Sequence, residues 1–233
     1  MDLILDAIWE TFLLLSQGDS EIWSITLRTL IICGSSTIVS FAFGASAGFC
    51  LAVLPFRGRA ALVTFANTGM GMPPVIAGLL VAILLWRSGP FGGLNLIYTP
   101  IAMIISQCVI AIPLVAAITA GSFMSLPESL FLQIRSLGAG RKETLFLLAY
   151  EARLGLMVAM MAGFGAVISE VGAAMMVGGN LAGDTRVLTT ATVLLVSKGE
   201  FGRALAYGIV LLAMVFVVAV ILTSVQNLAR KRI

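Results

Sequence analysis

The stretch Arg135-Ser-Leu-Gly-Ala-Gly-Arg-Lys142 carries three basic residues between two long apolar segments, residues 97–121 and 150–177. Each segment is long enough to cross the hydrocarbon core of a bilayer, which takes about 20 mainly apolar residues. Membrane proteins concentrate basic residues in the loops of one side. This stretch therefore predicts that the chain crosses a membrane more than once, with the basic loop on the cytoplasmic side.

The overall composition supports the same class of protein. The chain has 233 residues, of which 60% are hydrophobic and 11% charged, and its mean hydropathy is +1.08. A soluble domain would have about a quarter charged residues. We therefore predict an all-α integral membrane protein. The acids Asp2 and Asp6 stand where a signal peptide would have a basic region, so no signal peptide is expected. The net charge of +3 reflects loop topology, and no nucleic-acid partner is expected.

Hydropathy predicts a polytopic bundle of about five transmembrane helices within one domain, residues 1–233. The predicted spans are residues 25–54, 60–86, 97–121, 150–177 and 204–228. Residues 122–149 form the predicted cytoplasmic loop. Residues 1–20 have apolar side chains at helical spacing among acids, which predicts a helix on the outer interface. An extension packed against the bundle is the alternative.

The distribution of Lys and Arg predicts the orientation. Five basic residues fall on the side of the N-terminus and nine on the other side. The nine are Arg57, Arg59, Arg135, Arg141, Lys142, Arg153, Arg230, Lys231 and Arg232. Because the cytoplasmic side carries the excess of basic residues, we expect the N-terminus outside and the C-terminus inside.

Small residues recur every four positions along the first predicted span. They are Ser36, Ser40, Gly44, Gly48 and Ala52. Such a stripe lies on one face of a helix and lets a second helix approach closely, which is how helices associate in lipid. We interpret the stripe as a packing surface.

The chain lacks the residues that several kinds of site require. It has no histidine, which excludes the usual haem and zinc ligation and leaves no predicted metal site. None of the three lysines follows a glycine, so no Walker A loop can form. Cys33, Cys50 and Cys108 all fall within predicted spans, where we expect buried, reduced thiols. We predict no catalytic residue.

Two stretches predict irregular backbone within the membrane. Pro73 and Pro74 fall inside the second predicted span and must interrupt its hydrogen-bond ladder. A half-helix that starts there would point its positive end at the membrane centre, where free amides suit an anion. A packing kink is an equally good interpretation. Gly178-Gly179-Asn180 ends the fourth span and is predicted to act as a gate or outer vestibule.

Glu170 is the one ionisable residue well within a predicted span. Intramembrane carboxylates are costly and usually pair with another group. We expect Glu170 to accept hydrogen bonds from backbone amides, or to pair with Arg186 or Arg28, in a structural role. A direct role in transport is the alternative.

Several stretches between residues 60 and 202 resemble, in order and spacing, the permease subunits of ABC importers for oxyanions. The similarity is greatest to tungstate permeases, with molybdate permeases next. The stretches are Met72-Pro-Pro-Val-Ile-Ala-Gly-Leu79, Arg87-Ser-Gly-Pro-Phe-Gly92, Ser106-Gln-Cys-Val-Ile-Ala-Ile-Pro113, residues 170–180, Thr185-Arg-Val-Leu-Thr-Thr190 and Lys198-Gly-Glu-Phe201.

The resemblance implies that the basic loop contacts an ATPase. The family's coupling loop reads E-A-A-x3-G-x9-I-x-L-P, and Gly138 keeps its glycine. Leu132-Gln-Ile134 stand in place of E-A-A, and Tyr150-Glu151 in place of Leu-Pro. Short helices broken at Gly138 and Gly140 would transmit movement of the ATPase, whereas a solvated positive loop is the alternative. The implied contact residues are Arg135, Ser136, Leu137, Gly138, Ala139, Gly140, Arg141 and Lys142.

The resemblance also implies the protein's partners and function. It implies a homodimer in the cytoplasmic membrane, two cytoplasmic ATPase subunits that bind ATP, and an extracytoplasmic binding protein that delivers the anion. The permease itself would hold no cofactor and catalyse no reaction. The alternatives are the same machine for molybdate, sulfate or phosphate, an ion-coupled secondary carrier, and a non-transporting membrane assembly subunit.

Overall fold

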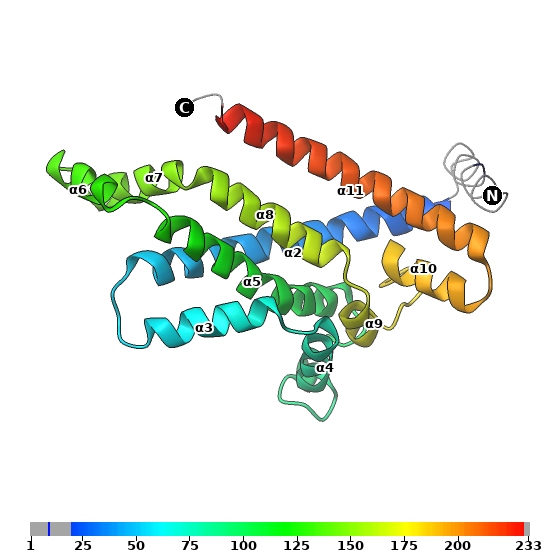
Figure 1. The fold of residues 1–233 in the computed structure, drawn as a ribbon. Coiled ribbons are helices and arrows are strands. Elements are labelled where there is room, and N and C mark those ends of the chain that lie inside the picture. The colour runs from blue at the N-terminus through cyan, green and yellow to red at the C-terminus, as the bar shows by residue number, and fades with distance from the viewer. Residues whose placement is uncertain (1–8, 10–19, 231–233) are drawn as a thin grey trace.

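The computed structural model describes residue 9 and residues 20–230, and within these residues the secondary structure is entirely helical. The helices form one elongated bundle (Figure 1). They are α2 (Ser20–Val53), α3 (Arg59–Met70), α4 (Pro74–Leu85), the 3-10 turn η1 (Gly92–Leu94), α5 (Pro100–Met124), α6 (Glu128–Ser136), α7 (Arg141–Glu151), α8 (Arg153–Ile168), α9 (Gly172–Gly178), α10 (Leu188–Ser197) and α11 (Phe201–Arg230). The interfacial helix predicted for residues 1–20 falls outside the described residues, apart from Trp9 and Ser20.

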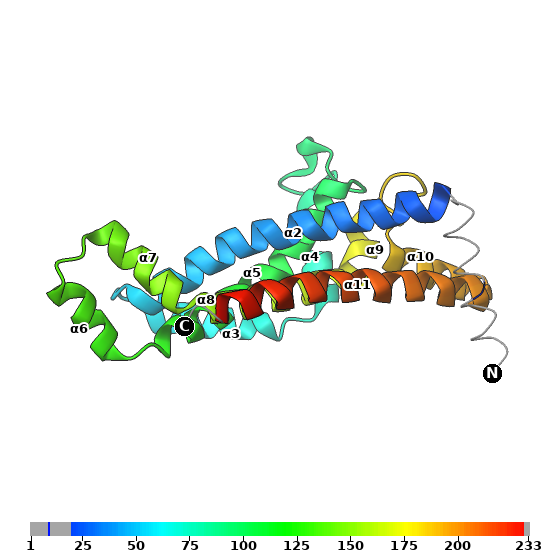
Figure 2. The ribbon, with the colours of Figure 1, turned by 90° about the horizontal axis from the view of Figure 1, so that it is seen from above.

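The helices match the predicted membrane architecture. Three of them, α2, α5 and α11, are long and apolar enough to cross a bilayer. Two bent pairs bring the number to as many as five: α3 with α4, bent by 105°, and α7 with α8, bent by 66°. The prediction of an all-α polytopic bundle is confirmed. The long helices run side by side, whereas α4 projects from the side of the bundle (Figures 1 and 2).

The predicted small-residue stripe on α2 is a packing surface against α5. Ser36, Ser40, Gly44 and Gly48 are all buried. A Cβ at Gly44 would lie 2.8 Å from the Cβ of Val115, and one at Gly48 would lie 2.7 Å from the Cβ of Thr119. Real Cβ atoms do not approach so closely, so only glycine allows the two helices this separation. The stripe prediction is confirmed.

The second predicted span is broken where its prolines predicted. α3 ends at Met70, and α4 starts at Pro74 with Pro73 as its N-terminal cap. Proline at the first position of a helix is favourable because its missing N–H would have no partner there. The fixed φ of Pro73 and Pro74, together with the loss of their N–H groups, prevents one helix from continuing through residues 71–73.

The fourth predicted span, residues 150–177, is wrong as a continuous helix. α7 passes into α8 through a bend at Ala152, and α8 ends at Ile168. A second break follows at residues 169–171, and α9 starts at Gly172. Serine and valine have modest helix propensity and glutamate is a good helix former, so none of the three forces a break, which explains why hydropathy missed it.

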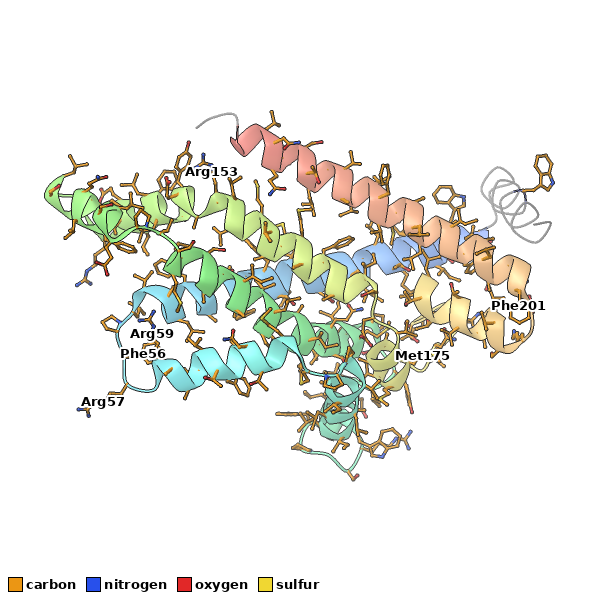
Figure 3. The ribbon with its side chains drawn as sticks, in the orientation of Figure 1. Phe56, Arg57, Arg59, Arg153, Met175 and Phe201 are labelled. Carbon is orange, nitrogen blue, oxygen red and sulfur yellow. The ribbon has the colours of Figure 1, made fainter. Side chains whose placement is uncertain are left out.

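The end of the bundle opposite α6 and α7 is closed by α10 and the start of α11. Helix α10 was not predicted, because its ten residues are too short to cross a membrane. Its Leu188, Ala191 and Leu195 pack with Ile22 of α2 and Tyr207 of α11. Arg57, Arg59 and Arg153 lie toward the α6–α7 end, whereas Phe201 lies at the α10 end (Figure 3).

The cysteines are only partly as predicted. All three are free, and Cys33 and Cys108 are buried. Cys50 is exposed on the surface of this chain, so the expectation of a buried thiol is wrong there. Cys50 lines an apolar hollow together with Leu62 of α3 and Pro113 of α5, which leaves its side chain exposed.

Candidate functional site

The basic loop forms a turn between two short helices at one end of the bundle (Figure 1). Helix α6 ends at Ser136, and α7 starts at Arg141. Gly138 has φ +70°, in the left-handed region that costs other residues energy and that glycine adopts freely. The N–H of Ala139 donates to the carbonyl of Ile134 at 3.4 Å and closes the turn. The predicted breaks at Gly138 and Gly140 are confirmed.

A small apolar core fixes α6 and α7 to the bundle. Phe123 at the end of α5, Ile134 on α6 and Leu148 on α7 are buried together with Ala152. Phe49 of α2 meets Phe123 edge-on, with ring centroids 5.0 Å apart. Helices α6 and α7 therefore contact the ends of α2 and α5 through side chains.

The exposed face of the α6–α7 segment is apolar as well as basic. Leu132, Leu137 and Phe146 are exposed to 68%, 83% and 70%. Arg141 and Lys142 stand beside them at the start of α7, and both are exposed. Large apolar side chains left exposed next to charges mark a surface that another protein covers. The segment can therefore serve as a contact for a partner protein.

The break at Pro73-Pro74 places the start of α4 against the start of α9. A Cβ at Gly78 would lie 2.5 Å from the Cα of Ala173, so the two backbones touch. Ala77 of α4 and Ala173 of α9 are fully buried in one cluster with Ile110 of α5. Neither α4 nor α9 has a charged residue. Two short apolar helices thus meet beside α5, inside the bundle.

Glu170 lies in the break between α8 and α9, where it caps α9. Its carboxylate Oε1 accepts a hydrogen bond from the N–H of Ala173 at 2.6 Å, and the residue is 6% exposed. A Cβ at Gly172 would lie 2.9 Å from the Cγ2 of Val75 and 3.6 Å from this oxygen. Gly172 therefore lies between the carboxylate and the first turn of α4.

The alternative pairing of Glu170 with an arginine is wrong. Arg28 donates instead to the carbonyls of Gly183, at 2.8 Å, and Arg186, at 3.1 Å. Arg186 pairs with Glu21 at 3.5 Å. Glu170 accepts a hydrogen bond from a backbone amide, as the other alternative predicted. Its negative charge faces the N-terminal end of α9, where a negative charge is favourable.

Gly178-Gly179-Asn180 form the end of α9 and the turn after it. Gly179 and Asn180 have φ +67° and +52°, so the chain turns left-handed at two consecutive residues. The hydroxyl of Thr185 donates to the carbonyl of Gly178 at 2.5 Å and accepts from the N–H of Leu181 at 2.9 Å. The predicted gate stretch is therefore a turn held by hydrogen bonds, at the far end of α9 from Glu170.

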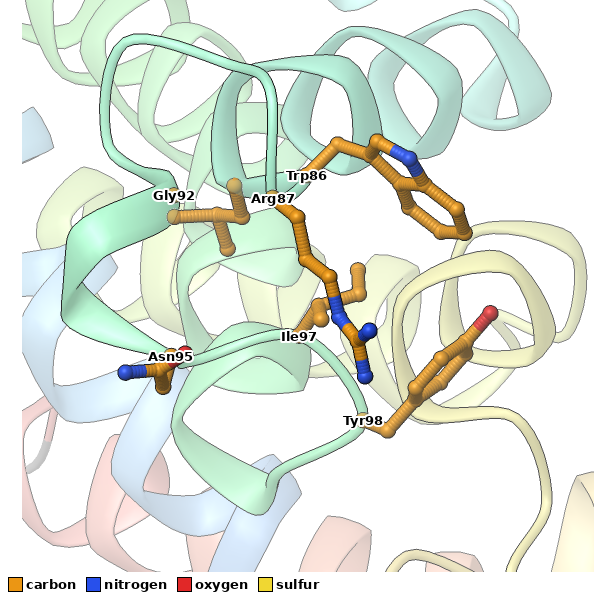
Figure 4. A pocket seen from close by; sticks show the side chains of 7 residues that line it. Trp86, Arg87, Gly92, Asn95, Ile97 and Tyr98 are labelled. Atoms are coloured by element: carbon orange, nitrogen blue, oxygen red, sulfur yellow. The ribbon is translucent and has the colours of Figure 1, made fainter.

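A hollow with a volume of about 620 Å³ lies in the turn between α4 and α5. Its lining includes Trp86, Arg87, Asn95 and Tyr98 (Figure 4). The rings of Trp86 and Tyr98 meet edge-on with centroids 6.4 Å apart. The N–H of Tyr98 donates to the carbonyl of Val177 at 2.8 Å, which joins this turn to the end of α9.

The structure brings some predicted site residues together and separates others. Gly172, next to the carboxylate of Glu170, lies against Val75 in the first turn of the helix that starts at Pro74, whereas the basic loop lies at one end of the bundle. Trp86 and Tyr98 were not predicted as site residues. Their signal in the sequence is weak, because only the position of Arg87 directly after an apolar segment and before Gly89-Pro90 marks an outer turn.

The described residues contain no group of three His, Cys, Asp or Glu side chains that could hold a metal ion. Glu170 is an isolated carboxylate among apolar side chains and backbone groups.

Relatives of known name match almost the whole chain. The tungstate uptake system permease protein of Peptoclostridium acidaminophilum is 33% identical over 97% of this chain and 100% of the relative. A "probable anion ABC transporter permease protein" of Haloferax volcanii is 35% identical over 82% of this chain and 85% of the relative. The molybdenum transport system permease protein of Escherichia coli K12 is 25% identical over 78% and 84%.

The fold agrees with these relatives. An inward-facing structure of the MetNI methionine ABC transporter matches 90% of this chain and 94% of its own with a TM-score of 0.68, at 18% identity. The family model described as the binding-protein-dependent transport system inner membrane component matches residues 40–233. With both the sequence match and the broken-helix bundle in agreement, the chain belongs to the family of binding-protein-dependent transport system inner membrane components.

Proposed function

We propose that this chain is the permease subunit of an ATP-driven importer for an oxyanion, with tungstate as the first candidate. The observation that carries the proposal is the match to a tungstate uptake permease along the whole length of both chains. The chain has no Walker A loop, so ATP is hydrolysed on separate subunits. Molybdate is the second candidate, because a molybdenum permease matches with lower identity.

The translocation path runs past the junction of α4 and α9. Two copies of the chain face each other, and each contributes Pro73 and Pro74 at the start of α4 and Gly178, Gly179 and Asn180 at the end of α9. The N-terminal end of α4 carries the positive end of the helix dipole, which suits a passing anion. Glu170 acts as a structural carboxylate that caps α9 and stays out of the path.

The α6–α7 segment receives the movement of the ATPase subunits. Its contact residues are Arg135, Ser136, Leu137, Gly138, Ala139, Gly140, Arg141 and Lys142. The tight turn at Gly138 and the apolar core below it support the proposal, because they make the segment rigid enough to act as a lever. When two ATPase subunits close on ATP, the segments of the two permease copies move together and the path changes the side to which it opens.

Transport by the reconstituted complex tests the function. Proteoliposomes with the permease, its ATPase and its binding protein should take up tungstate when ATP is inside, and a non-hydrolysable ATP analogue should stop the uptake. Sulfate and phosphate should not compete. An ion-coupled carrier would instead lose uptake on addition of a protonophore at constant ATP. The complete absence of oxyanion flux would point to a non-transporting assembly subunit and contradict the proposal.

Cysteine labelling tests the orientation, with the N-terminus outside and the C-terminus inside. In a variant without the native cysteines, Asp184→Cys should react from outside in intact cells, whereas Arg141→Cys should react only after permeabilisation. The two positions lie at opposite ends of the bundle, and the excess of basic residues marks the end with Arg141 as cytoplasmic. Labelling of position 141 from outside would reverse the orientation.

A further inference from the structure

The turn between α4 and α5 carries Arg87, a charged residue whose side chain has no polar partner among the described residues. The guanidinium of Arg87 points into the hollow of about 620 Å³, beside the ring of Tyr98 and below that of Trp86 (Figure 4). It makes no hydrogen bond or ion pair with any described residue. None of the residues that line the hollow is acidic, so the charge of Arg87 is not neutralised there.

The turn is built to hold this arginine in place. The N–H of Gly89 donates to the carbonyl of Trp86 at 2.7 Å, and that of Phe91 to the carbonyl of Leu84 at 3.0 Å. Asn95 and Tyr98 have φ +51° and +64°, a left-handed conformation that is costly for a residue as large as tyrosine. Such strain persists only where the surrounding structure fixes it, and it concentrates at functional sites.

The lining of the hollow carries two other hydrogen-bond donors. The indole N–H of Trp86 and the hydroxyl of Tyr98 belong to the lining of the same hollow. Arginine presents several N–H groups in a planar fork that matches the oxygens of an oxyanion. A ligand with negative oxygens therefore fits this lining, whereas a cation would find no carboxylate there.

The hollow also lies next to the proposed path. Tyr98 is bonded through its N–H to the carbonyl of Val177, and a Cβ at Gly179 would lie 2.7 Å from its ring. One wall of the hollow is therefore in contact with the turn that ends α9. The hollow therefore lies beside the C-terminal ends of α4 and α9, two helices whose backbones touch nearer their starts, at Gly78 and Ala173.

We propose that Arg87, with Trp86 and Tyr98, forms a capture site for a tetrahedral oxyanion, at which the ion is first held after release from the binding protein. The proposal rests on the proposed function and names a site for its substrate. The hollow is wide enough to admit the ion with part of its hydration shell, so the ion is held weakly. Weak binding suits a transport site, because the ion must leave again.

Arginine modification tests the binding directly. The purified permease–ATPase complex, in nanodiscs and without binding protein, is treated with phenylglyoxal, and modification of each arginine is followed by peptide mass spectrometry. Millimolar tungstate should slow the modification of Arg87 by about tenfold, as expected when the anion concentration is about ten times the dissociation constant, whereas chloride at equal ionic strength should not. Arg57 is exposed at the other end of the bundle and is the internal control, which neither anion should protect. Equal modification of Arg87 with and without tungstate would overturn the proposal.

Transport assays distinguish a failure of the capture site from a failure of the proposed function. Arg87→Gln should lower the maximal rate of tungstate uptake by about tenfold or more, since a charged hydrogen-bonding partner is lost. Lys198→Gln removes the same charge from an exposed residue at the α10 end and should transport normally. If the wild type takes up tungstate and Arg87→Gln takes it up at the same rate, the capture site is overturned but the proposed function stands. Loss of binding-protein association in Arg87→Gln would also overturn it, because Arg87 would then be a docking residue.

Discussion

Two pairs of helices in the same bundle differ in their continuity: one pair is unbroken, and the other consists of short helices that begin after breaks. α2 and α5 are continuous, and they pack through Gly44 and Gly48 so closely that no side chain fits between their backbones. α4 and α9 are short, begin after breaks, and also touch backbone to backbone. The continuous pair runs without a break, whereas the broken pair places helix ends beside α5. We therefore propose that the first pair provides stability and the second provides sites.

The largest effect should come from filling the contact of the continuous pair. Gly48→Leu should remove most of the folded protein, because its side chain would collide with the backbone carbonyl of Ala116 and with Thr119. Overpacking costs about 1–3 kcal/mol, and here the obstacle includes rigid backbone. Size-exclusion chromatography of the solubilised protein after heating measures the loss.

Gly34→Leu is the matched control on the same helix, because a Cβ there meets nothing within 4 Å. It should yield normal amounts of folded protein. If both variants were equally stable, α2 and α5 would be able to separate without cost, and the distinction between a rigid and a broken pair would fail.

The next largest effect is expected in the turn between α6 and α7, at the end of α2 and α5. Gly138→Leu should leave the protein folded and inserted but abolish the coupling of ATP hydrolysis to transport. Leucine in the left-handed conformation of Gly138 costs about 1–2 kcal/mol, so the turn between α6 and α7 would rearrange. Transport, ATPase copurification and stimulated hydrolysis are the measurements.

Gly138→Asn distinguishes backbone conformation from a simple need for a small residue, since asparagine tolerates the left-handed region. It should keep a substantial part of the transport. Normal copurification and normally stimulated hydrolysis in Gly138→Leu would count against the proposed role of the loop.

A smaller effect is expected in the broken pair. Glu170→Leu would leave the buried N–H of Ala173 without its acceptor, which costs about 1–3 kcal/mol. The amount of folded protein should fall. Glu170→Gln keeps an acceptor oxygen and should retain substantial transport with nearly normal stability.

The two Glu170 variants together decide between the structural and the transport interpretation. Thermal stability and tungstate uptake should fall in parallel across the wild type, Glu170→Gln and Glu170→Leu. Stable Glu170→Gln protein without any transport would make Glu170 a residue of the path.

The two breaks also show how far the sequence could predict the structure. The break at Pro73-Pro74 was predictable, because proline cannot continue a helix and two in succession leave no alternative. The break at Glu170 was not, because it depends on a carboxylate that folds back onto the N–H of Ala173, a contact that only the packed structure provides. The two arginines predicted as possible partners of Glu170 bind other groups: Arg28 donates to backbone carbonyls, and Arg186 pairs with Glu21.

The same reasoning applies to the candidate sites. The turn at Gly138 was predictable from two glycines among basic residues after a proline-terminated span. The hollow around Arg87 was not, because its wall includes the contact of Tyr98 with Val177, which joins residues far apart in the sequence. The conformation of Tyr98 itself, with φ +64°, contradicts its local preference and is imposed by this contact.

The smallest expected effect is the permease's own choice between two anions. The proposed path near Pro73 and Gly178 is lined by backbone groups, and neither α4 nor α9 carries Lys or Arg. This part of the proposed path therefore cannot bind a dianion tightly. The negative charge of Glu170 next to the first turn of α4 further weakens binding there. Arg87 adds one cation, and tungstate and molybdate present the same charge and shape to it. The permease–ATPase complex without its binding protein should therefore bind both anions weakly, with affinities that differ by less than about tenfold, equal to about 1.4 kcal/mol. Isothermal titration in detergent measures this, with Arg87→Gln as the control for the capture site. Tight binding that strongly favours tungstate would mean that the broken pair holds a selective site, unless an anion site on the ATPase subunits accounts for the signal.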